Sequence, residues 1–191
     1  VKESLGDAKM FVANAEIESR SRDPNLRIHD GFEKLVVQTY TNLKLLRGIT
    51  YTEANIEQCL NDSEDSLFGS DATAMSEAET EMLSLINRNT QKGIRTTAKG
   101  LVEDFERRPF GWYLAAILCN LAKLCGRGKV EARSDGETLE DAQLVTSLKS
   151  TRAHGNIVLE PQIEFTASQI RRVKDFYNDF FDQPPKSSEA K

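Results

Sequence analysis

The N-terminal part of the chain carries one long amphipathic pattern. From Ile28 to Leu46 apolar residues recur at helical spacing, and Gly48 follows the last of them. Asp23-Pro24 lies just ahead and is a typical helix start. Over residues 9–19 apolar and polar positions alternate weakly, which indicates a strand or an extended arm. We therefore predict an arm followed by a helix whose apolar face needs a partner.

Three consecutive helices are predicted in the middle of the chain. A capping box formed by Ser76 and Glu79 opens the first. Thr96 or Thr97 caps the second, and the third occupies residues 112–125. The residues that would end these helices follow in order: Gly93, Pro109, Gly126 and Gly128.

Short strands are predicted after the third helix. Residues 129–133 form the first, Asp135-Gly136 fits a tight hairpin turn, and residues 156–160 form the second, with a short helix near 141–149 between them. Three helices, a strand, a turn and a returning strand are the order of a winged helix. The predicted fold class is mainly α (α+β): a helical N-terminal part, a winged-helix-like domain with a short β-hairpin, and a C-terminal helix.

Acidic residues dominate the stretch 53–81, which holds nine of them and no Lys or Arg. Within it, residues 61–75 are rich in Ser, Asp and Gly, which predicts a flexible acidic linker. Because the chain starts at Val1 without a signal-peptide pattern, we expect it to be a piece of a longer protein. The predicted organisation is a helical segment with an N-terminal strand or arm (1–60), the linker (61–75), the winged-helix-like domain (76–165), a C-terminal helix (166–183) and a disordered tail (184–191).

Composition narrows the possible functions. The formal net charge is −5, which excludes a protein that coats nucleic acid by bulk charge but allows a local basic patch. No apolar run approaches the roughly 18 residues of a membrane span, so we expect no membrane contact. Three cysteines without framework spacing (Cys59, Cys119 and Cys125) indicate reduced, buried thiols in a cytoplasmic protein.

Motifs of catalysis are missing from the sequence. It contains no GxxxxGK[ST] phosphate loop, no GxGxxG, no HExxH and no GxSxG. The histidines, His29 and His154, have no zinc-like spacing with the cysteines. We therefore predict no catalytic, cofactor-binding or metal-binding residue in this chain, and no enzymatic activity of its own.

The distribution of basic residues suggests that the chain contacts a nucleic acid. Between Met82 and Arg133 they outnumber acidic residues, and a winged helix with a positive surface can contact a phosphate backbone. However, the helix that would enter the major groove, 112–125, is almost entirely apolar, with Asn120 and Lys123 as its polar members. The candidate contacts are in the wing: Arg127, Lys129 and Arg133.

Four aromatic residues cluster around the start of the third helix. Phe105, Phe110, Trp112 and Tyr113 follow helical and turn spacing. That spacing is more typical of a packed core than of a stacking platform for bases. We therefore expect Trp112 to be buried.

Several sequence pieces, in order along the chain, resemble the large P-loop ATPase of BREX phage-resistance systems, the BrxC/PglY-like family. The pieces are Phe11-Val12 with Ile17, Arg27-Ile28, Leu35 to Leu46, Arg108 to Trp112, Leu121 to Leu124, Gly128 to Glu131, and Phe165 to Ile170.

This resemblance implies an antiviral defence protein that uses ATP and Mg²⁺ as a full-length ATPase. It also implies that the present segment lies downstream of the nucleotide-binding core. The expected partners are other BREX proteins or other parts of the parent ATPase, with DNA as the alternative partner. We expect a non-catalytic interaction or structural region, and the alternative is a winged-helix module that makes weak, non-specific contacts with the DNA backbone.

Overall fold

The structure is a computed structural model that describes residues 2–19, 21–65 and 75–162, together with Arg172, Phe176 and Phe180. The chain divides into two compact units, Val1–Pro161 and Gln162–Lys191. Of the second unit the structure describes Gln162, which is not helical, and Arg172, Phe176 and Phe180, which are helical. The rest of the predicted 166–183 helix and the 184–191 tail lie outside the described residues. None of the described helices has the length and hydropathy that crossing a membrane requires.

The predicted N-terminal arm is a small helix and a β-hairpin followed by a long helix. Its elements are α1 (Lys2–Asp7), β1 (Met10–Val12), β2 (Ala15–Ile17) and α2 (Pro24–Thr39). The Asp23 carboxylate accepts the N–H groups of Asn25 and Leu26, which fixes the start of α2 at the predicted position. The helix ends at Thr39, short of the predicted Leu46, and a separate 3₁₀ turn, η1 (Leu43–Leu46), follows.

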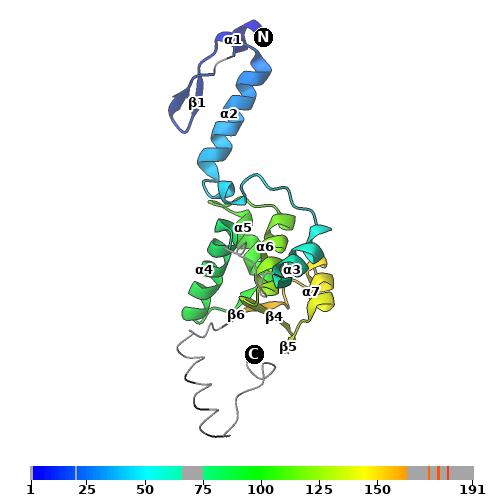
Figure 1. Cartoon of the computed structure of the whole chain (residues 1–191). Helices are drawn as coiled ribbons and strands as arrows, with labels where there is room; N and C mark the ends of the chain where they lie inside the picture. Colours follow the sequence, from blue (N-terminus) through cyan, green and yellow to red (C-terminus); the bar gives the residue numbers. More distant parts are fainter. Residues whose placement is uncertain are drawn as a thin grey trace. The chain divides into compact units, whose positions relative to one another are not determined.

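The winged-helix topology is confirmed (Figure 1). Its elements are α4 (Glu77–Gln91), β3 (Thr96–Thr97), α5 (Ala98–Glu106), α6 (Leu114–Gly126), β4 (Val130–Ser134), β5 (Glu137–Thr138), α7 (Asp141–Lys149) and β6 (Val158–Pro161). The antiparallel strands are arranged in the order β3-β6-β4-β5, so the returning strand β6 lies between β3 and β4. Helices α4 and α5 start where the sequence predicts them, because the Ser76 hydroxyl accepts the Glu79 N–H and the Thr97 hydroxyl accepts the Gly100 N–H.

The wing is longer than a simple hairpin. Asp135 and Gly136 both have positive φ angles, 53° and 89°, and turn the chain tightly from β4 into β5 as the sequence predicts. The chain then forms α7 before it returns as β6 on the other side of β4. Leu144 and Leu148 of α7 are buried, so this inserted helix extends the core.

The acidic stretch does not separate two domains where we expected. The helix predicted near 52–60 is α3 (Asn55–Asp65), which overlaps the start of the expected 61–75 linker, and residues 66–74 lie outside the described residues. The side chains of Ile56, Cys59 and Leu60 are buried in the same core as α6. Apolar positions at i, i+3 and i+4 need a partner surface, and α6 supplies it, so residues before 61 belong to the winged-helix core.

Gly111 lets the chain pass between α5 and α6 under the ring of Tyr40. Its φ is 63°, and a Cβ placed there would lie 2.4 Å from Cδ1 of that ring. Gly128 has nearly the same φ, 61°, with no atom within 4 Å of such a Cβ. Both glycines therefore adopt a left-handed backbone conformation, but only at Gly111 would a side chain also clash with a neighbouring residue.

This pair predicts a graded loss of stability. Gly111→Ala and Gly128→Ala should each lose about 1–2 kcal/mol for a left-handed alanine. Gly111→Ala should lose roughly 1–3 kcal/mol more, because the Tyr40 ring has to move. Urea unfolding followed by circular dichroism measures both. Equal midpoints for the two variants would contradict the packing of Tyr40 on Gly111.

Candidate interaction site

The helix that reads DNA in many winged-helix proteins is covered here. Nine of the 13 residues of α6 are buried, and α3 makes the most extensive contact with it of any element. In Figure 1, α3 lies beside α6, and α7 lies next to α3. Neither of its polar members is available to read a base: Asn120 is fully buried and donates to the Ala116 carbonyl, and Lys123 donates to the Tyr51 hydroxyl. Insertion of α6 into a major groove would require α3 to leave.

The predicted wing contacts are mostly engaged with carboxylates. Arg127 Nε lies 3.0 Å from Glu79 Oε2, and its side chain is only 15% exposed. Arg133 pairs with Glu131 at 2.9 Å and with Glu160 at 3.6 Å, and these contacts raise its pKa. Lys129 is partly buried and also has an interaction partner. The three residues are close together in the sequence, but the structure does not gather them into a continuous face of uncompensated positive charge.

The pair Glu79–Arg127 is a buried link between α4 and the end of α6. The Glu79 side chain is 3% exposed and its second carboxylate oxygen accepts the Ser76 hydroxyl at 2.9 Å. Along α4, Glu79 is in phase with the buried residues Met82 and Ile86, so it faces the core. The carboxylate is thus held by a cap on one side and a cation on the other.

Lys123 and Tyr51 connect α6 to the segment before α3. The ammonium donates to the Tyr51 hydroxyl at 3.1 Å and lies 5.0 Å from the centroid of that ring. Desolvation lowers the pKa of Lys123, but the hydrogen bond to Tyr51 and nearby charges outweigh it, and the pKa is raised. The lysine therefore stays charged and serves as an internal contact.

The three cysteines are free thiols, and their surroundings disfavour thiolate chemistry. A hydrogen bond with Cys59, reinforced by burial, raises the pKa of Cys119. Burial raises the pKa of Cys125 to about 12. Because the thiolate is the nucleophile and the metal ligand, protonated thiols at neutral pH act as small apolar side chains.

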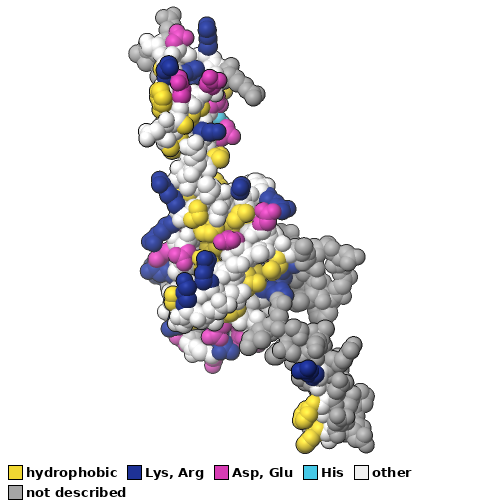
Figure 2. Space-filling model, turned by 90° about the vertical axis from the view of Figure 1, so that its left-hand side faces the viewer, with side chains coloured by type: hydrophobic (Ala, Val, Ile, Leu, Met, Phe, Trp, Pro, Cys, Tyr) yellow, Lys and Arg dark blue, Asp and Glu magenta, His cyan; other side chains and the backbone are white. Residues whose placement is uncertain are grey.

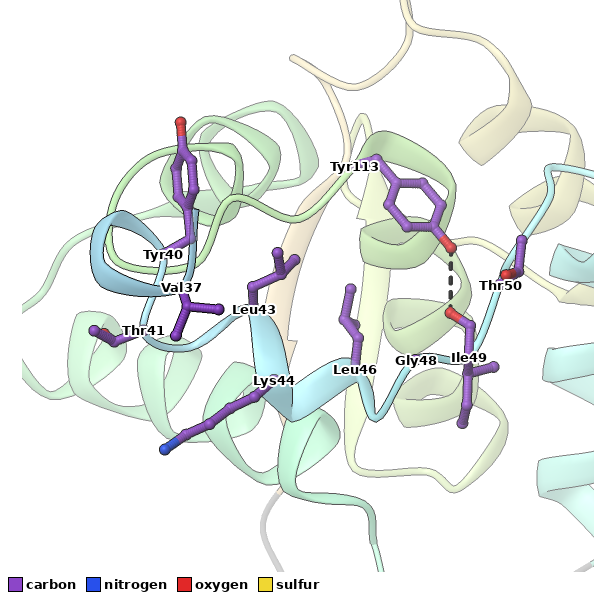
Figure 3. A pocket seen from close by; sticks show the side chains of 10 residues that line it. All are labelled: Val37, Tyr40, Thr41, Leu43, Lys44, Leu46, Gly48, Ile49, Thr50 and Tyr113. Atoms are coloured by element: carbon purple, nitrogen blue, oxygen red, sulfur yellow. Dashed lines mark hydrogen bonds between the residues drawn. The ribbon is translucent and has the colours of Figure 1, made fainter. Parts of the chain in front are cut away.

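An apolar pocket of about 490 Å³ lies where η1 and the following loop approach Tyr113. In Figure 3 the Tyr113 hydroxyl points at the Ile49 carbonyl, to which it donates at 3.4 Å. The same hydroxyl accepts the Tyr51 N–H at 2.6 Å. Leu43 and Leu46 point toward the interior beside this ring, whereas Lys44 extends away from it. The full lining is Val37, Tyr40, Thr41, Leu43, Lys44, Leu46, Gly48, Ile49, Thr50 and Tyr113.

Helix α2 presents apolar side chains to solvent. None of its 16 residues is buried, although α1 and β1 contact it. Phe32 is 63% exposed, and at helical spacing it shares one side of the helix with three further apolar residues. We call this set the α2 stripe: Ile28, Phe32, Leu35 and Val36.

One cluster on α2 was not predicted from the sequence. His29, Asp30 and Glu33 bring possible metal-ligand atoms within 4.8 Å of one another. Their spacing on adjacent turns is the signal that would have indicated it. His29 and Glu33 are exposed, and Asp30 accepts a hydrogen bond from the Ser19 hydroxyl at 2.5 Å, which ties α2 to the segment before it.

Comparison with protein families agrees with this architecture. Residues 42–163 match the model described as the BREX ATP-binding protein BrxC winged helix-turn-helix domain. The match begins at η1 and ends after β6, so it includes α3 as part of the domain. No solved structure shows a significant match to the chain. The chain therefore belongs to the BrxC family of BREX ATP-binding proteins and carries their winged helix-turn-helix domain.

Proposed function

We propose that this region is a non-catalytic docking segment of its BREX ATP-binding protein, which holds another BREX protein or another part of the parent chain. The α2 stripe is the observation that carries this proposal. A helix that exposes a large aromatic and three aliphatic residues on one side stays in water only at a cost of about 25 cal/mol per Å² of apolar surface. Contiguous exposed apolar surface of this kind marks protein contact sites.

Two further observations support docking over base reading. Helix α6 is covered by α3, and its polar residues make internal hydrogen bonds. The pocket beside Tyr113 adds a concave apolar surface that could receive a partner's side chain. The region would then act as a winged helix whose usual reading helix has become part of the core.

Contact of the wing with a DNA backbone is the alternative. Arg127, Lys129 and Arg133 would each have to exchange existing partners for phosphates. An ion pair that is already formed must be broken before its cation can neutralise a phosphate. For this reason we rank docking above the wing alternative.

A pull-down with the full-length parent tests the docking proposal. Phe32→Ser/Leu35→Ser should remove at least one BREX partner, or should release an intramolecular contact and expose the region to limited proteolysis. Lys34→Ser/Gln38→Ser is the matched control, because both residues are exposed on the other side of the same helix. If both double variants keep every partner and the same proteolytic pattern, the α2 stripe is not a docking surface.

A further inference from the structure

A basic patch on a different face of the domain is unused by the proposed function. Between Glu81 and Glu103 the sequence has no acidic residue and four basic ones. They lie on the last turns of α4, in the turn before β3 and in the first turn of α5. We call them the α4–α5 patch: Arg88, Lys92, Arg95 and Lys99.

Local hydrogen bonds hold these elements together. The Ile94 N–H donates to the Asn89 carbonyl at 2.9 Å, which folds the turn back on α4. The Asn89 side chain donates to the Thr96 hydroxyl at 3.2 Å, which joins that turn to β3. The cations therefore project from a fixed frame, although each side chain is long and can adapt.

The charge of the patch is not compensated within the described part of the chain. All four side chains belong to exposed residues, and none of them makes an ion pair with a described residue. Figure 2 shows Lys and Arg side chains on the face that includes α4, together with Asp and Glu side chains. Along the same elements Glu103 follows one turn after Lys99, and Glu160 on the neighbouring strand β6 is paired with Arg133. This differs from the wing, where Arg127 and Arg133 already have partners.

We infer that the α4–α5 patch binds the phosphate backbone of duplex DNA. Protein interfaces are centred on aromatic and aliphatic anchors, whereas Ile94 is the one large exposed apolar residue between Arg88 and Lys99. The first amides of α5 are also engaged: those of Ala98, Lys99 and Gly100 donate to Ile157, His154 and Thr97. Contact must therefore come from the long cationic side chains, which suits a row of phosphates and gives no sequence preference.

The physical consequence is weak binding with strong salt dependence. Non-specific affinity should be on the order of 10⁻⁴ to 10⁻⁶ M at physiological salt. If all four cations neutralise phosphates, the slope of log K against log salt should be about −3.6. Unrelated duplexes of equal length should bind equally, because no base edge is read.

Fluorescence anisotropy of the 191-residue chain with a labelled duplex at several salt concentrations tests the inference. Arg88→Glu/Lys92→Glu should weaken binding at least about tenfold at low salt and reduce the slope by about 2. Arg22→Glu/Lys34→Glu makes the same change of charge on exposed residues of the arm and should have a much smaller effect. Melting temperatures of both variants should match the parent, since all four positions are exposed.

Three outcomes would overturn the inference. The first is the absence of saturable binding by the parent at low salt. The second is an equal loss of binding from the arm variant and the patch variant. The third is competition by poly-L-glutamate as strong as that by unlabelled duplex, which would assign the patch to an acidic protein segment instead.

Discussion

Trp112→Ala should lose roughly 3–5 kcal/mol of unfolding free energy, the range for truncating a fully buried large aromatic. The indole is 1% exposed, and it stacks on Phe105 with ring centroids 4.5 Å apart and meets Phe110 edge-on at 5.5 Å. Its Nε1 also donates to the Asn42 carbonyl at 3.1 Å. The substitution therefore opens a cavity at the start of α6 and removes the tie to the segment before η1.

Urea unfolding followed by far-ultraviolet circular dichroism measures this loss, since Trp112 is the single tryptophan and its fluorescence disappears with it. Trp112→Phe keeps most of the ring contact but loses the N–H, so it should cost about 1–2 kcal/mol. Phe11→Ala truncates an aromatic that is 61% exposed and should change stability by less than about 0.5 kcal/mol. A Trp112→Ala midpoint equal to that of Phe11→Ala would contradict the burial of the indole.

Local signals in the sequence were sufficient for most of the element boundaries. Asp23, Ser76 and Thr97 each accept the backbone N–H groups that their cap positions predict. The predicted helix at 141–149 has the same bounds as α7, and Asp135-Gly136 makes the predicted turn. Such features depend on a few consecutive residues, which is why one sequence is enough to find them. The two-residue strand β3 is too short to leave a pattern.

Contacts between segments that are distant along the chain could not be predicted from the sequence in the same way. The sequence shows that α6 is apolar on nearly every side, which requires a cover, but it does not say which segment supplies that cover. The acidic composition after Asn55 suggested separation from the domain, yet Ile56, Cys59 and Leu60 form the apolar side of that helix. Three apolar positions in phase outweighed the acidic ones, because the acidic side chains can remain in water while the apolar ones are buried.

The candidate wing site shows why charge counted along a sequence can mislead. Arg127 and Arg133 are cations in a basic stretch, but Arg127 pairs with Glu79 of α4, and Arg133 pairs with Glu131 of its own strand and with Glu160 of β6. The phase of Glu79 with Met82 and Ile86 was the available signal that a carboxylate faced inward and needed a cation. By contrast, the four cations of the α4–α5 patch lie in a stretch without acidic residues. There the positive charge counted along the sequence is also uncompensated among the described residues of the structure.

Arg127→Met should lose roughly 3–5 kcal/mol, the range for removing one partner of a buried ion pair. The guanidinium is the 3.0 Å partner of a carboxylate whose side chain is 3% exposed, so the variant leaves a buried charge without its cation. Arg133→Met is the control: its side chain is 41% exposed, so water replaces its ion pairs and the loss should be much smaller. Urea midpoints for the two variants give the comparison.

Substitution of Glu79, the ion-pair partner of Arg127, separates the effect of the lost charge from a simple loss of packing. In the Arg127→Met background, Glu79→Gln removes the uncompensated charge and should recover part of the stability, because replacing both members of a buried pair is often close to neutral. In the parent, Glu79→Gln leaves the guanidinium partly buried without its anion and should be destabilising. The two effects therefore have opposite signs, and a double-mutant cycle should give a coupling of about 0.5–3 kcal/mol. If Arg127→Met instead keeps the parent's stability and weakens binding to every duplex tested, Arg127 is a phosphate contact as the sequence suggested, and the buried pair does not hold α4 to α6.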